Sequence, residues 1–285
     1  MEWFRLAAFA DEASPSADGQ FAALQRNSLH GVEMRDIDGQ NVTKLSLTKA
    51  KELRKQLEDR GLVVWSLGTP LGKTELGRDD FEAELDKLRY TLEVADVLGS
   101  SNIRMFSFYL PGSEDPAVYR QQVLDRLGQM AEAARGSGVT LCHENEKGIY
   151  GDTPERCVDI LTQIPELRAI YDPANFIQCG QDTWHAWMLV HPYVKYMHIK
   201  DALADGRVVP PGEGVGQIAR LLEAYRAQGG QWLSIEPHLG QFVGLAALER
   251  EGEKSVVGTY AYESLDAAFD AACQALKKVL GGMKA

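Results

Sequence analysis

The segment GVTLCHENEKGIYGDTPERC (residues 138–157) carries the pattern that decides the fold of this chain. Its first part, VTLCHE, is a short apolar run of the kind that forms a strand buried on both faces. Its last part begins with Thr153 and Pro154, a cap followed by the proline with which many helices open. Charged and polar side chains, His143 to Lys147, fill the point where the strand should end. A plain turn needs no such groups, so a strand–loop–helix unit with a chemical role is predicted.

The same strand-then-helix unit recurs along the whole chain. The apolar runs predicted as strands are RLAAFA, GVEMRD, LVVWSLG, NIRMFSF, VTLCHE, RAIYD, VKYMHIK and WLSIEP. Amphipathic segments lie between them, the first with Ser14 as its expected cap and Pro15 at its first position. With roughly 35 residues per unit, this alternation predicts an α/β fold, a single (β/α)8 TIM barrel, as one domain over residues 1–285. The alternative is a doubly wound open sheet, but the first strand ends in AFADEASP, without the glycine turn of that fold.

Composition restricts the classes of function. The chain has 41 Asp and Glu against 30 Lys and Arg, and the formal net charge of -11 disfavours binding to nucleic acid. Its four cysteines are scattered without a C-x-x-C pair, which predicts free thiols in a reducing compartment. We find no signal-peptide pattern and no apolar run of roughly 20 residues, so a cytoplasmic protein outside the membrane is expected.

Four side chains of the types that bind metals stand at the ends of four consecutive predicted strands: Glu144, Asp172, His198 and Glu236. Because the C-terminal ends of barrel strands meet at one mouth, the four are expected to surround one quadrant of it. Three carboxylates and one imidazole suit a single divalent cation, with Mn²⁺ favoured and Zn²⁺, Co²⁺ and Mg²⁺ as alternatives. Taken singly, each has a structural alternative: a solvated acid, a turn-forming Asp or a core histidine.

Further polar residues are expected to contact substrate at the same mouth. Asn145 and Lys147 follow the fifth strand, and a surface ion pair with Glu146 is an equal alternative for Lys147. Glu33 and Arg35 alternate on the second strand, where they would form an ion pair that supports substrate or a purely structural salt bridge.

Loop residues add candidates of a different kind. Lys73 and Lys200 would hold hydroxyls or a phosphate, unless they are solvated. The glycines of PPGEGVG (residues 210–216) precede a predicted helix, and either a phosphate nest or a plain turn fits them. Residues 238–263 form the longest gap between predicted elements and are expected to be a lid or binding loop.

Several motifs resemble those of the xylose-isomerase-like TIM barrels, often called sugar phosphate isomerases or epimerases. They are HENEKGIYGDTPERC, YDPANF, MHIKDA and SIEPHLG, with FADEASP, VEMRDIDGQNV and SLGTPLGK earlier in the chain. The resemblance implies a divalent metal on the four ligand-type residues and an acid/base pair, Glu144 and Glu236. Related ketohexose epimerases carry a histidine where this chain has Asn175, so an equivalent substrate does not follow. Asn175 and Arg207, the latter in the place of the family's substrate arginine, are expected to bind substrate.

The function that this resemblance implies is a divalent-metal-dependent isomerase or epimerase of a sugar, sugar phosphate or cyclitol. One glutamate would remove a proton next to a carbonyl, and the other would return it after a metal-bound enediolate has formed. Loss of a β-hydroxide from the same intermediate would give an inosose-type dehydratase instead. An endonuclease-IV-like DNA repair enzyme is disfavoured by the presence of only six histidines, and a non-catalytic sugar-binding barrel by the four-ligand set. Family members often form homodimers or homotetramers.

Overall fold

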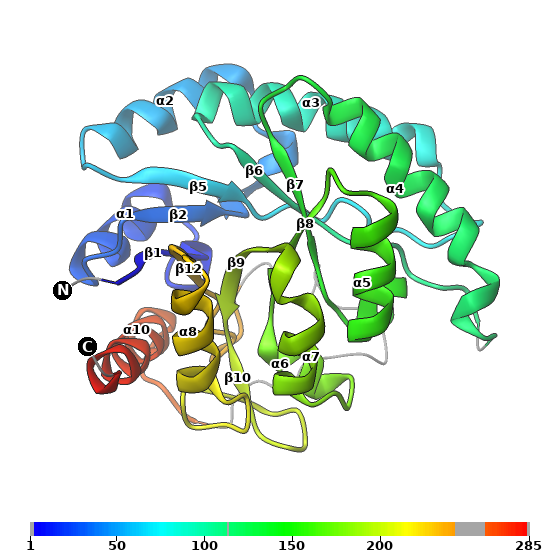
Figure 1. Cartoon of the computed structure of the whole chain (residues 1–285). Helices are drawn as coiled ribbons and strands as arrows, with labels where there is room; N and C mark the ends of the chain where they lie inside the picture. Colours follow the sequence, from blue (N-terminus) through cyan, green and yellow to red (C-terminus); the bar gives the residue numbers. More distant parts are fainter. Residues whose placement is uncertain (1–2, 113, 243–259, 284–285) are drawn as a thin grey trace.

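The computed structural model describes residues 3–112, 114–242 and 260–283 and has a closed barrel of parallel strands at its centre (Figure 1). Its strands are β1 (Arg5–Ala8), β2 (Gly31–Met34), β5 (Val63–Leu67), β6 (Asn102–Met105), β7 (Thr140–Glu144), β8 (Arg168–Tyr171), β9 (Val194–Ile199) and β12 (Trp232–Ile235). Each strand pairs with its successor in this series, and β12 closes onto β1 with Trp232 opposite Arg5. The predicted (β/α)8 barrel is therefore confirmed.

Helices surround the barrel on its outside, as Figure 1 shows. They are α1 (Ala17–Arg26), α2 (Leu47–Glu58), α3 (Phe81–Leu98), α4 (Arg120–Ala134), α5 (Pro154–Gln163), α6 (Pro173–Gln178), α7 (Thr183–Val190), α8 (Ile218–Ala227) and α10 (Leu265–Gly282). Short 3-10 helices are η1 (Ala10–Glu12), η2 (Val42–Lys44), η3 (Pro116–Val118), η4 (Tyr150–Asp152) and η5 (His191–Tyr193). Two small antiparallel pairs follow barrel strands: β3 (Asp36–Ile37) with β4 (Gln40–Asn41), and β10 (Asp201–Ala202) with β11 (Val208–Val209). None of the described helices is both long and apolar enough to cross a bilayer.

Helix starts follow the capping signals of the sequence, with one shift. Thr153 accepts a hydrogen bond from the Arg156 amide, so α5 begins at Pro154 as predicted. The first helix begins two residues later than predicted, because Ser16 rather than Ser14 accepts from the Gly19 amide. Side-chain caps of this kind satisfy amides that have no partner within the helix.

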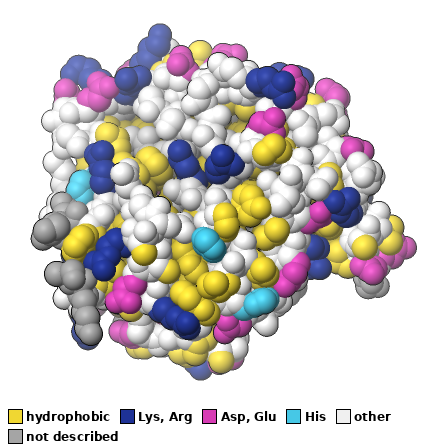
Figure 2. Space-filling view, viewed as in Figure 1, with side chains coloured by type: hydrophobic (Ala, Val, Ile, Leu, Met, Phe, Trp, Pro, Cys, Tyr) yellow, Lys and Arg dark blue, Asp and Glu magenta, His cyan; other side chains and the backbone are white. Residues whose placement is uncertain are grey.

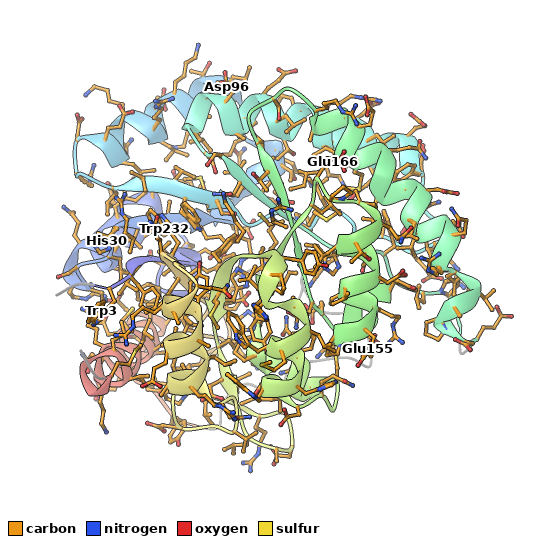
Figure 3. All side chains as sticks on the ribbon, viewed as in Figure 1. Trp3, His30, Asp96, Glu155, Glu166 and Trp232 are labelled. Atoms are coloured by element: carbon orange, nitrogen blue, oxygen red, sulfur yellow. The ribbon has the colours of Figure 1, made fainter. Side chains whose placement is uncertain are left out.

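The barrel interior changes character along its axis. Near the strand starts it is filled by Ala7, Cys142, Ile170, Tyr196 and Trp232, with Trp65 stacked on Trp232 at 4.2 Å. Trp232, the first residue of β12, and His30, which directly precedes β2, are labelled in Figure 3 and lie at this N-terminal end. The opposite, C-terminal end of the interior is lined by charged side chains. The predicted lid loop starts after the C-terminal end of β12, and its residues 243–259 are outside the described part of the chain.

Candidate active site

Four ligand-type side chains meet at the C-terminal mouth of the barrel: Glu144, Asp172, His198 and Glu236. All four are buried, and one ligand atom from each lies within 4.8 Å of the others. His198 Nδ1 is 3.0 Å from Glu144 Oε1, 3.6 Å from Glu236 Oε2 and 3.9 Å from Asp172 Oδ2. Ligand bonds to a small divalent cation are about 2.0–2.2 Å long, so oxygen and nitrogen ligands roughly 3–4 Å apart are spaced to share one ion.

The backbone around Asp172 is fixed by two asparagines. Asn145 Nδ2 donates to the Asp172 carbonyl at 2.9 Å, and the Asp172 amide donates back to Asn145 Oδ1 at 3.0 Å. Asp172 also caps α6, because its Oδ1 accepts from the Asn175 amide at 2.9 Å. Asn175 Nδ2 in turn donates to Glu144 Oε1 at 3.2 Å. Asn145 and Asn175 were both predicted to bind substrate. In the structure their hydrogen bonds fix the positions of Asp172 and Glu144.

Glu33 occupies a different place from the one predicted. It is fully buried, and its Oε2 lies 3.0 Å from His198 Nε2 while its Oε1 accepts from the Tyr196 hydroxyl at 2.7 Å. A carboxylate on one imidazole nitrogen fixes the ring so that the other nitrogen, Nδ1, faces the cluster. The expected ion pair with Arg35 is wrong, because Glu33 turns toward β9 instead.

Arg35 joins a second acidic group. Its Nε lies 2.7 Å from Asp11 Oδ2, and its Nη2 lies 3.2 Å from Glu12 Oε1. Its guanidinium lies over the rings of Phe9 and Phe242, 4.6 and 4.5 Å from their centres. Asp11 and Glu12 belong to η1, and no role at the mouth was predicted for either residue.

Arg104 is the functional candidate that sequence reasoning missed. Its Nη1 lies 3.1 Å from Glu144 Oε2 and 3.6 Å from Glu236 Oε1, and the residue is only 2% exposed. One feature of the sequence could have identified it. Arg104 is a charged residue inside the apolar strand run NIRMF, and no acidic residue stands beside it in the sequence to pair with it.

Lys200 lies between two of the candidate ligands. Its Nζ donates to Glu236 Oε2 at 2.7 Å and lies 2.9 Å from Asp172 Oδ2. The second contact has the distance of an ion pair but not the angles of a hydrogen bond, so Asp172 Oδ2 remains a buried oxygen without a hydrogen-bond donor among the described residues. An oxygen in that position is suited to bind a cation.

Burial and neighbouring charges shift the pKa values of the cluster residues in different directions. Burial is the largest influence on each group and by itself favours the neutral form. His198 and Arg104 overcome it at Glu144 and lower the pKa to about 2. At Asp172 burial outweighs Lys200 and raises the pKa to about 7. Glu144 and Glu33 overcome burial at His198 and raise its pKa to about 10.

Acidic side chains outnumber basic ones at the C-terminal end of the barrel interior. Six carboxylates line this end of the barrel, against three basic side chains, Arg35, Arg104 and Lys200. Buried ions need partners, since each unpaired one costs several kcal/mol, roughly, in desolvation. Without a metal ion, protons take up part of this excess, since the pKa of His198 is raised to about 10 and that of Asp172 to about 7. When all six acids are ionised and the imidazoles are neutral, the acids are three in excess, and a divalent cation removes most of that excess. The donor set and the charge therefore both fit a metal ion held by Glu144, Asp172, His198 and Glu236.

The remaining predicted residues lie nearer the surface. Lys73 Nζ is 3.1 Å from Glu146 Oε2 and lies over the Phe106 ring, so this pair borders the mouth. The Lys147 amide donates to Glu146 Oε1. The structure does not bring Arg207 into the cluster, because it is exposed and its Nε donates to Asp205 at 2.8 Å.

The glycine-rich loop after β11 does not offer a vacant phosphate nest. The amides of Gly212, Gly214 and Gly216 all donate to the Asp201 carboxylate, at 2.9, 3.0 and 2.9 Å. Asp201 follows Lys200 directly, so it ties this loop to the end of β9. The turn interpretation is therefore confirmed and the nest interpretation is wrong.

The fold and the cluster together define a TIM-barrel protein whose C-terminal mouth carries four side chains that could bind one metal ion. A family model described as "Xylose isomerase-like TIM barrel" matches residues 21–255. The match covers most of the chain, and the protein belongs to this family. The expectation of an enzyme is in keeping with that membership. A comparison with curated proteins finds no match.

Solved structures share the fold over nearly the full length at low identity. IolI protein with a bound zinc atom superposes with a TM-score of 0.78 at 13% identity, over 99% of this chain and 100% of that one. D-psicose 3-epimerase with D-tagatose, from Clostridium cellulolyticum H10, gives 0.72 at 13% identity, with coverage of 99% and 100%. The probable 3-DHS dehydratase AsbF from Bacillus anthracis gives 0.72 at 16% identity, with coverage of 96% and 98%.

Proposed function

We propose that this protein is a divalent-metal-dependent isomerase or epimerase of a sugar, sugar phosphate or cyclitol. The observation that carries the proposal is the convergence of Glu144, Asp172, His198 and Glu236 within 4.8 Å in a buried, acid-rich mouth. Neighbours of the same fold include a zinc-containing protein and an epimerase, which supports the class without naming the substrate. Mn²⁺ is the favoured metal because three of the four donors are hard oxygens.

A bound divalent cation would stabilise negative charge on a carbonyl oxygen and make the neighbouring carbon more acidic. The chain itself supplies the proton transfers. Glu144 and Glu236 both have a pKa below that of an ordinary glutamate. His198 and Arg104 overcome the effect of burial at Glu144, and Lys200 and His238 are the largest opposing influences at Glu236. Both are therefore ionised and able to accept a proton from the carbon, one on each side of the substrate.

A dehydratase on the same site is the second candidate, and Lys200 is the observation that favours it. Its Nζ donates to Glu236 at 2.7 Å, so an ammonium stands next to one of the bases. An ammonium there can give a proton to a departing hydroxyl group, which isomerisation does not require. The endonuclease alternative gains no support, since Asn175, in the position of a histidine ligand, donates to Glu144.

The test is a substrate screen in D₂O with the Mn²⁺-loaded protein and ketoses, inososes and their phosphates. We expect deuterium to appear at a carbon next to a carbonyl, and a product that has lost the elements of water, seen by mass spectrometry, would distinguish the dehydratase. Glu144→Gln and Glu236→Gln should each lower exchange by about 100-fold or more, with the fold unchanged by circular dichroism. Glu155→Gln, on the outer face of α5 and labelled in Figure 3, is the matched control. Full exchange in Glu236→Gln would refute the mechanism.

Three further expectations belong to the same proposal. A cytoplasmic location is expected from the chain's composition and free thiols. A homodimer or homotetramer is expected because members of the family often form such oligomers. The partner is a small carbohydrate rather than nucleic acid or membrane. Size-exclusion chromatography with light scattering measures the oligomeric state directly.

A further inference from the structure

The two oxygens of Glu236 face different surroundings. Oε2 faces the metal-type cluster, where Lys200 donates to it at 2.7 Å. Oε1 faces Arg35 Nη1 at 3.5 Å, Arg104 Nη1 at 3.6 Å and His238 Nε2 at 3.5 Å. Among the described residues Oε1 forms no hydrogen bond. The nitrogen atoms around it lie within ion-pair distance but do not donate a hydrogen bond to it.

Two of those neighbours are buried groups with unused hydrogen-bonding capacity. Arg35 Nη1 and both ring nitrogens of His238 are buried and lack a hydrogen-bond partner within the described part of the chain. Leaving such a group unsatisfied is unfavourable, and most buried polar atoms in native proteins are paired. An unpaired set next to a proposed catalytic base therefore indicates that a polar ligand group completes it.

The surrounding structure holds both groups rigidly in place. Asp11 and Glu12 occupy the other nitrogens of Arg35, and Phe9 and Phe242 cover its two faces. The His238 amide donates to Glu12 Oε2 at 2.6 Å, and its backbone has φ of 44°. A left-handed backbone is unfavourable for a histidine, so the fold supports an orientation that the local chain would not choose.

From this geometry we infer that Arg35, His238 and Glu236 form a subsite for one hydroxyl group of the substrate, next to the reacting carbon. This inference rests on the proposed function. A guanidinium donates, while a neutral imidazole donates at one nitrogen and accepts at the other, which matches the donor and acceptor of a hydroxyl. A hydroxyl oxygen placed beside Glu236 Oε1 could lie about 2.9 Å, the usual hydrogen-bond distance, from both Arg35 Nη1 and His238 Nε2.

Charge excludes an anionic group at this position. Asp11 and Glu12 already neutralise Arg35, and Glu236 Oε1 lies 3.5 Å from the same guanidinium. A phosphate or carboxylate would face three buried acids with no uncompensated cation beside it. The subsite therefore takes a neutral hydroxyl group and disfavours the analogue that lacks it, because the buried groups would then stay unpaired.

The test compares binding of D-fructose with its monodeoxy analogues, and of scyllo-inosose with its deoxy analogue, to the metal-loaded protein. We expect wild type to bind one deoxy analogue about tenfold more weakly than the parent, and His238→Ala to lose that difference while the other positions keep theirs. His238→Gln should restore part of it. His185→Ala, an exposed histidine on α7, should behave as wild type.

Other outcomes separate this inference from the function on which it rests. If the protein exchanges deuterium but the deoxy preference survives in His238→Ala, the subsite is wrong and the function stands. If no carbonyl compound exchanges, the proposed function falls and the subsite with it. Glu12, Glu236 and His238 also have ligand atoms close enough to hold a cation. A second bound Mn²⁺ that disappears in His238→Ala would overturn the subsite in favour of a metal.

Discussion

The imidazole of His198 lies between carboxylates on both of its nitrogens. Glu33 lies 3.0 Å from Nε2 and Glu144 lies 3.0 Å from Nδ1. Phe9 contacts the ring edge-on at 5.2 Å between centres. Only the Nδ1 side faces the cluster, so Glu33 determines which nitrogen is presented to a metal ion.

Glu33→Gln is predicted to weaken metal binding without removing a ligand. The amide oxygen that replaces the carboxylate accepts more weakly from the Nε2–H of His198, so the ring becomes a weaker base and Nδ1 a weaker metal ligand. We expect the Kd for Mn²⁺ to rise by about 10–100-fold, measured by isothermal titration calorimetry. Glu155→Gln serves as the control, and an unchanged Kd in Glu33→Gln would contradict the orienting role.

Lys200→Met is predicted to destabilise the metal-free protein more than the metal-loaded one. Without the ammonium, Asp172 and Glu236 lose their shared buried counterion, which costs about 3–5 kcal/mol when no other cation is present. A bound Mn²⁺ takes over that neutralisation. Urea unfolding in chelator and in Mn²⁺ measures both values, and Lys195→Met, at the exposed start of β9, is the control. Equal losses under the two conditions would argue against the shared counterion.

At the level of secondary-structure elements, each strand–helix unit contributes the end of its strand and the first residues of the following loop to the mouth of the barrel. Asp172 ends one such unit and caps the next helix, while Asn145 from the neighbouring unit fixes its backbone. Asp201 plays a similar part after β9, where its carboxylate gathers the amides of the glycine loop ahead of α8. Side chains at Gly214 and Gly216 would collide with Asp201, which explains glycine at both positions.

Asp201→Asn is expected to lower the free energy of unfolding by about 2–3 kcal/mol. The amide keeps one acceptor oxygen but turns a donor toward backbone donors. Each carboxylate oxygen of Asp201 accepts from two backbone amides, so two amides lose their partner. Urea denaturation monitored by fluorescence gives the value. Asp205→Asn, in the exposed turn of the same hairpin, should unfold at the wild-type urea concentration, and equal behaviour of the two variants would refute the loop-organising role.

At the scale of the whole molecule, closure brings the two ends of the chain together. Arg26 of α1 forms ion pairs with Asp266 and Asp270 of α10, at 2.6 and 2.9 Å. Figure 1 shows both helices on the same side of the barrel, near the marked termini. Charges of both signs are interspersed over the face in Figure 2, and six further carboxylates are buried at the mouth. These buried acids lie where a bound cation could neutralise part of their charge.

Metal binding is accordingly predicted to stabilise the entire fold. Mn²⁺ at about a hundredfold excess over its Kd should raise the free energy of unfolding by about 2.7 kcal/mol. Calorimetry with and without chelator measures this as a shift in Tm. Asp172→Asn should show a much smaller shift, whereas an identical Tm in chelator and in Mn²⁺ would speak against a metal site.

The barrel and the four converging residues could be predicted from local features of the chain, namely the spacing of apolar residues, the helix caps and the strand ends. The partners of the charged side chains could not, because they depend on how the closed barrel brings distant strands together. Glu33 reaches His198 across 165 positions, and Arg104 reaches Glu144 across 40. Such contacts join side chains inside the closed barrel, and local periodicity places a residue on a strand without stating which opposite charge it meets. That is why Arg104 was missed and Glu33 was assigned to substrate rather than to His198.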